Sequence, residues 1–123
     1  MEKGKKVIFL MKEKILLEKY LFIVENYGYR VNGFLIDEKI FEEIEKIESP
    51  DIFVIELDKC DNFIKRIVKR LKEKFNNSKF LVLVTEMNEE VGNFIVDFSI
   101  DSYLVFPVLP NQLLRGIFLL ANF

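Results

Sequence analysis

The sequence predicts one α/β domain in which five parallel strands form a sheet covered by helices on both faces. Three observations lead to this prediction. The chain has 123 residues, which is enough for a single hydrophobic core. Short apolar runs alternate with segments whose apolar residues recur at helical spacing. Runs that are apolar throughout are typical of parallel strands, because helices cover both sides of such a sheet.

The chain opens with a strand, a helix and a second strand. Residues 7–11 (VIFLM) are continuously apolar, and residues 16–27 repeat apolar side chains at helical spacing. Gly28 follows where a helix end favours a left-handed residue. Residues 30–36 form a weaker apolar run that contains Gly33, so this strand is predicted at an edge of the sheet.

The middle of the chain continues the alternation. A helix is expected from Asp37, a good N-cap, to the Ser-Pro pair at residues 49–50. Residues 52–55 (IFVI) then read as a central strand, because they are β-branched or aromatic throughout. A third helix is predicted over residues 63–75, and residues 80–84 are another apolar strand.

The last part of the chain completes a doubly wound sheet. A helix is expected after Asn88, a strand over residues 103–106, and a final helix that begins at Pro110. This alternation predicts the flavodoxin-like strand order 2-1-3-4-5, whose ligand crevice lies at the carboxyl ends of strands 1 and 3. Glu56 directly follows the run at 52–55, so it is predicted at the mouth of that crevice.

Composition narrows the range of functions. The formal net charge of -2 gives no reason to expect nucleic acid or a membrane as the main partner. With no histidine, Ser-His-Asp catalysis, Cys-His catalysis and histidine metal sites are excluded. Cys60 is the single cysteine, so it forms no internal disulfide, and we interpret it as incidental. We therefore expect a cytoplasmic protein with one domain over residues 1–123, in which residues 1–5 form a loose arm.

Three stretches resemble a known family: SPDIFVIEL at residues 49–57, FLVLVTE at 80–86 and DSYLVFPVLPNQLL at 101–114. They look like the third, fourth and fifth strands of the response regulator receiver domain of two-component signalling, which has the CheY-like form of the flavodoxin-like fold. The resemblance covers nearly the whole chain. It places Tyr103 at the family's switch aromatic and Pro107 in its conserved turn, so we expect a cis peptide before Pro107.

The resemblance also implies chemistry that these residues do not supply. An active receiver holds Mg²⁺ with an acid pair after the first strand, and those positions are Met11 and Lys12 here. The phosphate-accepting aspartate position is Glu56 and the lysine position is Phe106, whereas Thr85 keeps its family identity. A thioether and an ammonium cannot replace the oxygen ligands that Mg²⁺ requires. We therefore expect no metal, no cofactor, no phosphorylation and no enzymatic activity.

Glu56 has two interpretations. In one, it imitates a phosphorylated aspartate and holds an active-like state. In the other, which we favour because Phe106 replaces the lysine of the switch, it is a tethered surface charge. We predict that the Lys12 ammonium stands where the metal would and forms an ion pair with Glu56, directly or through one water, with Thr85 Oγ1 close enough to join. Asp58 and Glu86 lie nearby, but we expect no metal cluster there.

Two surfaces are candidates for partner binding. The third helix is basic, and we expect its charge to be largely neutralised by the acidic second helix beside it. The first and last helices carry more apolar residues than one buried stripe holds. Phe22, Leu119 and Phe123 should therefore reach the surface, with Arg115 at the rim. Because both helices cover the same side of the sheet, we expect a homodimer or partner interface there.

Three classes of function follow. The first is a non-catalytic signalling or protein-interaction module, similar to pseudo-receivers that act without phosphorylation. The second is the receiver domain of a larger response regulator, still switched by phosphorylation or by a small ligand in the modified crevice. The third is a dimerisation domain of a larger protein. We favour the first class, because the chemical positions are replaced while the strands and turns of the fold are kept.

Overall fold

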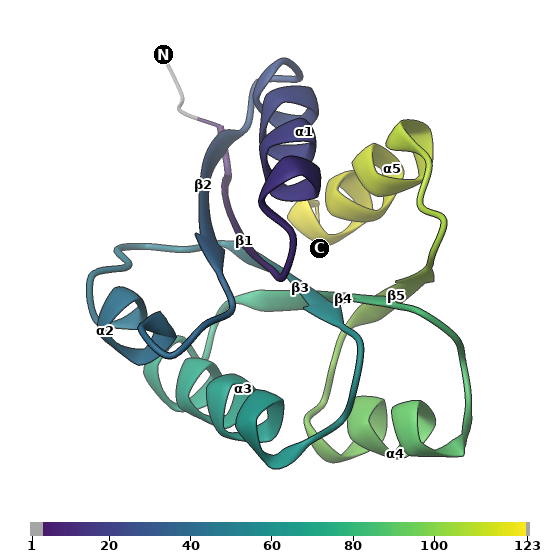
Figure 1. The fold of residues 1–123 in the computed structure, drawn as a ribbon. Coiled ribbons are helices and arrows are strands. Elements are labelled where there is room, and N and C mark those ends of the chain that lie inside the picture. The colour runs from purple at the N-terminus through teal and green to yellow at the C-terminus, as the bar shows by residue number, and fades with distance from the viewer. Residues whose placement is uncertain (1–3, 123) are drawn as a thin grey trace.

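A computed structural model describes residues 4–122 and confirms the predicted sheet (Figure 1). Five parallel strands are ordered β2-β1-β3-β4-β5. The strands are β1 (Lys6–Met11), β2 (Arg30–Leu35), β3 (Ile52–Leu57), β4 (Lys79–Val84) and β5 (Ser102–Val105). The helices are α1 (Lys14–Glu25), α2 (Ile40–Ile44), α3 (Asn62–Lys74), α4 (Glu89–Asp97) and α5 (Pro110–Ala121). Because β2 and β5 are the edges, the three central strands are β1, β3 and β4.

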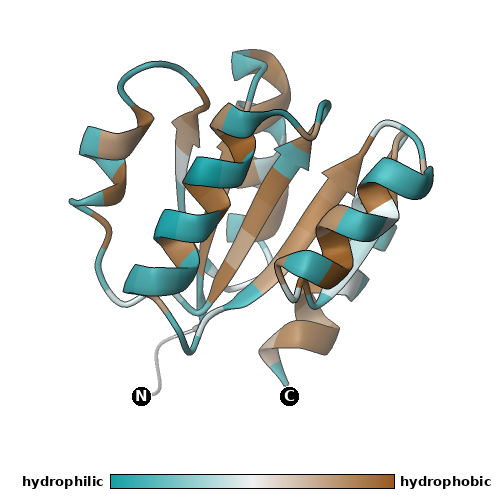
Figure 2. Ribbon diagram, turned by 90° about the horizontal axis from the view of Figure 1, so that it is seen from below, coloured by the Kyte–Doolittle hydropathy of each residue, from teal (hydrophilic) through white to brown (hydrophobic). Residues whose placement is uncertain are grey.

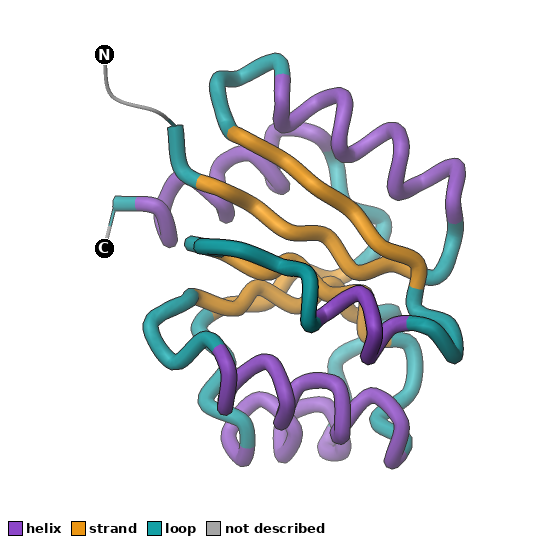
Figure 3. Tube along the Cα trace, turned by 90° about the vertical axis from the view of Figure 1, so that its left-hand side faces the viewer, coloured by secondary structure: helices purple, strands orange, loops and turns teal. Residues whose placement is uncertain are grey.

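The helices form a layer on each side of the sheet. In Figures 1 and 3, α1 and α5 cover one face, while α2, α3 and α4 cover the other. Side chains of β3 alternate between the two layers: Phe53 and Ile55 join the core under α2, α3 and α4, and Ile52 and Val54 join the core under α1 and α5. Figure 2 shows the same pattern in hydropathy, with apolar strands and with α2, α3 and α4 hydrophilic on the sides that face the viewer. The fold therefore has two cores that share one sheet.

Several predicted boundaries need correction. The second helix is short and begins at Ile40, because the carboxylate of Asp37 accepts a hydrogen bond from the backbone of Lys39 (2.9 Å) in a turn instead of capping the helix. β5 ends at Val105, so Phe106 lies just beyond the strand. α1 ends at Glu25, and Tyr27 is an exposed turn residue rather than part of the buried helical stripe.

The turn after α1 shows where the glycine is needed. Gly28 has a φ of 91°, as the sequence predicts for a residue that ends a helix. The predicted loose arm does not hold for Gly4 and Lys5. The carbonyl of Gly4 accepts a hydrogen bond from Arg30 Nε, and that of Lys5 accepts one from the backbone of Arg30 (both 3.0 Å). Residues 1–3 of that arm lie outside the described residues.

Within residues 4–122, no helix is long and apolar enough to cross a bilayer.

Candidate functional site

The carboxyl ends of the central strands bring together the loops in which the sequence places a site. The β1–β3 register pairs Leu10 with Ile55, so Lys12 lies just beyond the level of Glu56. Glu56 is the second-last residue of β3 and is half-buried, whereas Met11 is fully buried in the core beneath α1 and α5. Of the two positions expected after strand 1, only Lys12 therefore opens on the crevice.

A direct Lys12–Glu56 ion pair, one form of the prediction, is not present among residues 4–122. The Lys12 ammonium instead pairs with Asp58, at 3.2 Å between Nζ and Oδ2. Glu56 contacts the same residue through the main chain, because its Oε1 accepts a hydrogen bond from the Lys12 backbone N–H at 3.0 Å. A long, flexible lysine stem lets the ammonium reach past the strand end to the next acid. One lysine thus ties the loop after β1 to both the end of β3 and the loop beyond it.

Thr85 does not join these contacts. It directly follows β4 and is exposed, and its hydroxyl makes no hydrogen bond within the described part of the chain. The expectation that Thr85 Oγ1 lies against the Lys12–Glu56 pair is therefore wrong.

Two hollows flank the loop after β3. One, of about 230 Å³, is lined by Lys12, Ile36, Glu56, Asp58, Lys59, Asp61, Phe63 and Ile64. The other, of about 320 Å³, is lined by Asp58, Lys59, Cys60, Asp61, Asn88, Glu90 and Val91. Both contain acidic residues, but among residues 4–122 no three potential ligands from His, Cys, Asp and Glu are grouped so that they could hold a metal ion. Asp58, Lys59 and Asp61 line both hollows.

Cys60 lies in the wall of the larger hollow, where its chemistry is suppressed. Its thiol is buried. Burial first, and the negative charge of Glu90 second, raise the pKa of Cys60 above its ordinary value. Because the thiolate is the reactive form, the raised pKa disfavours reaction at this thiol.

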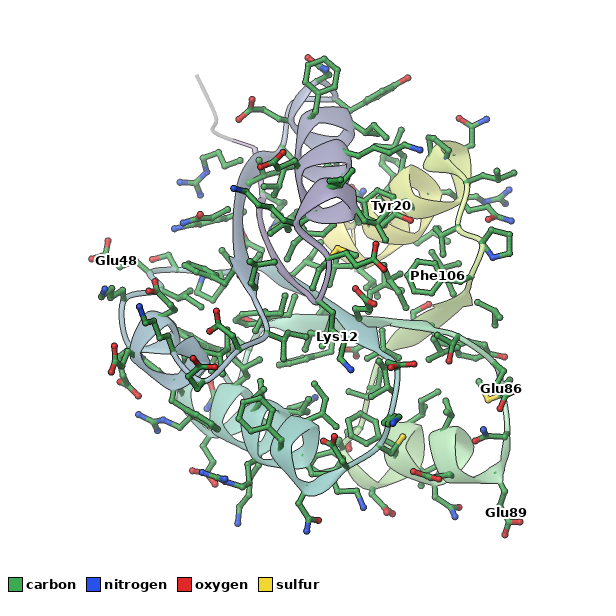
Figure 4. All side chains as sticks on the ribbon, viewed as in Figure 1. Lys12, Tyr20, Glu48, Glu86, Glu89 and Phe106 are labelled. Atoms are coloured by element: carbon green, nitrogen blue, oxygen red, sulfur yellow. The ribbon has the colours of Figure 1, made fainter. Side chains whose placement is uncertain are left out.

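Phe106 turns away from Lys12. It packs into the core beneath α1 and α5, and Figure 4 shows Phe106 near Tyr20 on that side while Lys12 extends toward α3 and α4. The Tyr20 hydroxyl donates to the carbonyl of Val108 (3.4 Å), which attaches α1 to the loop before α5. Burial, and secondarily the charge of Glu56, raise the pKa of Tyr20. The lysine position of the resemblance is thus occupied by a partly buried side chain that packs against the hydrophobic core.

The turn after β5 keeps the predicted shape. The Phe106–Pro107 peptide is cis, which confirms the sequence prediction. Tyr103 in β5 is 45% exposed, so the side chain at the switch aromatic position is open to solvent. Pro110 begins α5, as predicted.

Part of the basic third helix is paired within the protein. Arg70 contacts Glu45 at 2.6 Å, and Lys74 contacts the same carboxylate at 3.2 Å. The Lys72 ammonium donates to the carbonyl of Ser99 at 2.9 Å and lies 4.4 Å from the centre of the Phe80 ring. The expected pairing of α3 with the acidic segment at α2 is therefore present in part: two of the six basic residues of α3 form ion pairs among residues 4–122, both with Glu45.

We expect Glu45→Gln to weaken stability at neutral pH only. Hydrogen bonds from Arg70 and then Lys74 lower the pKa of Glu45 below its ordinary value of 4.5. A lowered carboxyl pKa stabilises the folded state above the ordinary value, and this contribution is lost as pH falls through the lowered pKa. Urea unfolding should show a small deficit for the variant at pH 7 that shrinks below pH 4.5 and then vanishes. A deficit in stability that is as large well below pH 4.5 as at pH 7 would contradict this account.

α1 and α5 expose apolar side chains on their outer sides, as predicted. Phe22 is 70% exposed and Leu119 is 46% exposed, while Phe123 lies outside the described residues. Beside them, a hollow of about 370 Å³ is lined by Tyr27, Tyr29, Leu114, Arg115 and Phe118, and we call it the α5 hollow. The sequence did not indicate this hollow, because Tyr27 reads as part of the buried stripe of α1. We call Ile15, Phe22, Leu119 and the α5 hollow together the α1–α5 surface.

Comparison with known structures shows the fold of a receiver domain. No protein-family model and no curated protein matches the sequence. A CheY-like response regulator receiver domain protein from Methanospirillum hungatei is similar, with a TM-score of 0.83, 19% identity and coverage of 98% of this chain and 95% of that chain. The chemotaxis response regulator CheY4 of Vibrio cholerae matches with a TM-score of 0.81, 17% identity and coverage of 96% and 99%.

A third similar structure carries a different description. It is a protein from Burkholderia thailandensis described as a pilus assembly protein, with a TM-score of 0.81, 14% identity and coverage of 97% of this chain and 99% of that chain. The chain therefore has the CheY-like receiver fold that the sequence predicts. Proteins with this fold serve different roles, so function has to be argued from the residues of this chain.

Proposed function

We propose that this chain is a non-catalytic signalling module of the pseudo-receiver type, which acts by binding a protein partner and needs no phosphorylation. The observation that carries the proposal is the Lys12–Asp58 ion pair at 3.2 Å in the crevice of a receiver fold. The ammonium stands in the region where a receiver holds its metal, and it neutralises a nearby carboxylate without any ligand. We further propose a cytoplasmic location, with the α1–α5 surface as the binding surface.

The donor set of the crevice does not fit Mg²⁺, the ion that the receiver fold implies. Mg²⁺ needs near-octahedral oxygen ligands, of which proteins usually supply one or two carboxylates. The Glu56 carboxylate accepts the Lys12 backbone N–H, and the Asp58 carboxylate pairs with the Lys12 ammonium. Met11 is buried and offers no oxygen in its side chain. A cation would have to displace the ammonium from Asp58, and the positive charge of Lys12 would oppose it.

Phosphoryl transfer also lacks its electrostatic support here. Catalysis of this transfer depends on positive groups that neutralise charge developing on the phosphoryl oxygens. Phe106 packs in the core and supplies no charge. The Glu56 carboxylate is also one methylene further along its side chain than an aspartate would be, and misplacement by about 1 Å costs roughly 100-fold. Both effects favour a module that remains unmodified.

The test is exposure of the whole chain to acetyl phosphate and Mg²⁺, read by intact mass, with an active receiver treated in parallel. We expect no phosphoryl adduct on this protein. The Glu56→Asp variant should also remain unmodified, since the acceptor type alone does not remove the Lys12 ammonium. A Mg²⁺-dependent adduct that disappears in Glu56→Gln would refute the proposal and favour a receiver that is still switched by phosphorylation.

A further inference from the structure

We infer that the α1–α5 surface binds a second copy of this chain, with Phe22 of each copy in the α5 hollow of the other. The inference rests on the proposed function, in which the module acts by association, and it identifies the partner. It starts from two features of one face: an exposed aromatic side chain on α1 and an open hollow against α5.

The α5 hollow has the composition of a binding site for an apolar group. Its lining joins three aromatic rings, one leucine and one arginine. Aromatic residues and arginine are the types that dominate binding energy at protein interfaces. Phe118 is 56% exposed in the wall, so the isolated chain leaves apolar surface open to water there. An apolar side chain that fills the hollow would remove this surface from water.

Arg115 gives the hollow a charge preference. It is the only charged residue of α5, from Pro110 to Ala121, and it is exposed. Within residues 4–122 its guanidinium forms neither a hydrogen bond nor an ion pair, although Arg70 and Lys74 on α3 are paired. The hollow therefore suits an apolar side chain that is flanked by a carboxylate.

The outer side of α1 offers that combination. Phe22 projects from this helix, with Glu18 one turn before it and Glu25 one turn after it. Residues three and four apart lie on the same side of a helix, so Glu18 and Glu25 flank the phenylalanine, and Lys19 lies beside it as well. Both acids are exposed, and neither is in an ion pair within the described chain. The two carboxylates of the α1 side thus complement the charge of Arg115, and Phe22 is the apolar group that would fill the α5 hollow.

Both halves of this contact belong to one chain and to adjacent helices of one face. A two-fold axis between two copies would therefore make the same contact twice, with each Phe22 in the opposite hollow and each Arg115 near the opposite acids. Such an isologous contact closes on itself and gives a dimer rather than a filament. A partner of another kind would have to supply both features by itself, so the second copy is the favoured occupant.

The first experiment measures the self-association of the whole chain by sedimentation equilibrium. We expect a dimer whose dissociation constant rises at least ~30-fold in Phe22→Glu, because a buried aromatic anchor is lost and a charge takes its place. The matched control is Val96→Glu, which makes the same kind of change at an exposed apolar residue of α4, on the opposite face. The control should leave the dimer unchanged, and circular dichroism should show that both variants are folded.

The second experiment tests the ion pairs by charge reversal. Arg115→Glu should weaken the dimer by roughly tenfold, and adding Glu18→Arg or Glu25→Arg should recover most of that loss. The inference is overturned by a wild-type monomer at about 1 mM, by a dimer that Phe22→Glu leaves intact, or by reversed pairs that both fail to recover association. A monomer would leave the absence of phosphorylation untouched, whereas a phosphoryl adduct on a normal dimer would refute only the proposed function.

Discussion

Replacing Phe53 by alanine is expected to destabilise the protein by ~3–5 kcal/mol, the usual cost of removing a buried phenylalanine. Phe53 lies in the central strand β3 and is fully buried. Its ring centroid is 5.1 Å from that of Phe80 and 5.5 Å from that of Phe75, so one substitution removes contacts with both β4 and the end of α3. Since domains of this kind are stable by about 5–15 kcal/mol, the loss is a large fraction of the total.

Thermal unfolding is the direct measurement for Phe53→Ala, and the melting temperature should fall by roughly 10 °C or more. Phe22→Ala is the matched control, because it removes the same atoms from a side chain that is 70% exposed. At a concentration where the chain is monomeric, the control should change stability by less than about 0.5 kcal/mol. Equal losses in the two variants would contradict the assignment of Phe53 to the core and Phe22 to the surface.

These two phenylalanines also show how much of the fold the sequence could predict. Phe53 lies in a continuous apolar run, and such runs identified β1, β3 and β4 within one or two residues. Phe22 lies on a helix with more apolar residues than one stripe can bury, and the surplus correctly predicted its exposure. Helix boundaries were less predictable, because local turn hydrogen bonds such as that of Asp37 compete with helix formation.

The sequence predicted where the candidate site lies in the fold, but it did not predict which side chains contact one another there. Strand order fixes which loops meet at the carboxyl end of the sheet, so Lys12 and Glu56 were correctly placed near each other. Which carboxylate pairs with the Lys12 ammonium, here Asp58, depends on how far the two side chains reach beyond the ends of their strands. Several carboxylates lie within reach of one flexible lysine, and periodicity does not discriminate between them.

The amino-terminal end of the sheet holds a contact that sequence reasoning did not find. Asp51 precedes β3, and its carboxylate accepts a hydrogen bond from the Lys6 backbone N–H (2.8 Å) while its own N–H donates to the Lys6 carbonyl (2.9 Å). Asp101 precedes β5 and forms the same pair of bonds with Phe80, at 2.7 and 3.0 Å. In both cases an aspartate one residue before a strand joins that strand to its neighbour. The signal for these contacts in the sequence was an aspartate that directly precedes a strand, which occurs twice.

The contact of Asp101 is expected to matter because it satisfies a backbone donor that water does not reach. Phe80 is fully buried, and the N–H of this residue donates to the Asp101 carboxylate. Removing the acceptor leaves a buried N–H unsatisfied, which costs ~1–3 kcal/mol. Asp51 caps the start of β1 in the same way, so the two residues together fix the first contacts between β1 and β3 and between β4 and β5.

We therefore expect Asp101→Ala to lower the free energy of unfolding by ~1–3 kcal/mol, measured by urea denaturation at neutral pH. Asp101→Asn should lose less than half as much, because its amide oxygen can still accept the Phe80 N–H. Asp97→Ala is the control for loss of one exposed carboxylate nearby: its side chain makes no hydrogen bond within residues 4–122, so stability should change by less than about 0.5 kcal/mol. If Asp101→Ala matches Asp97→Ala, the carboxylate does not hold the start of β4, and the backbone bond from Asp101 to the Phe80 carbonyl is sufficient alone.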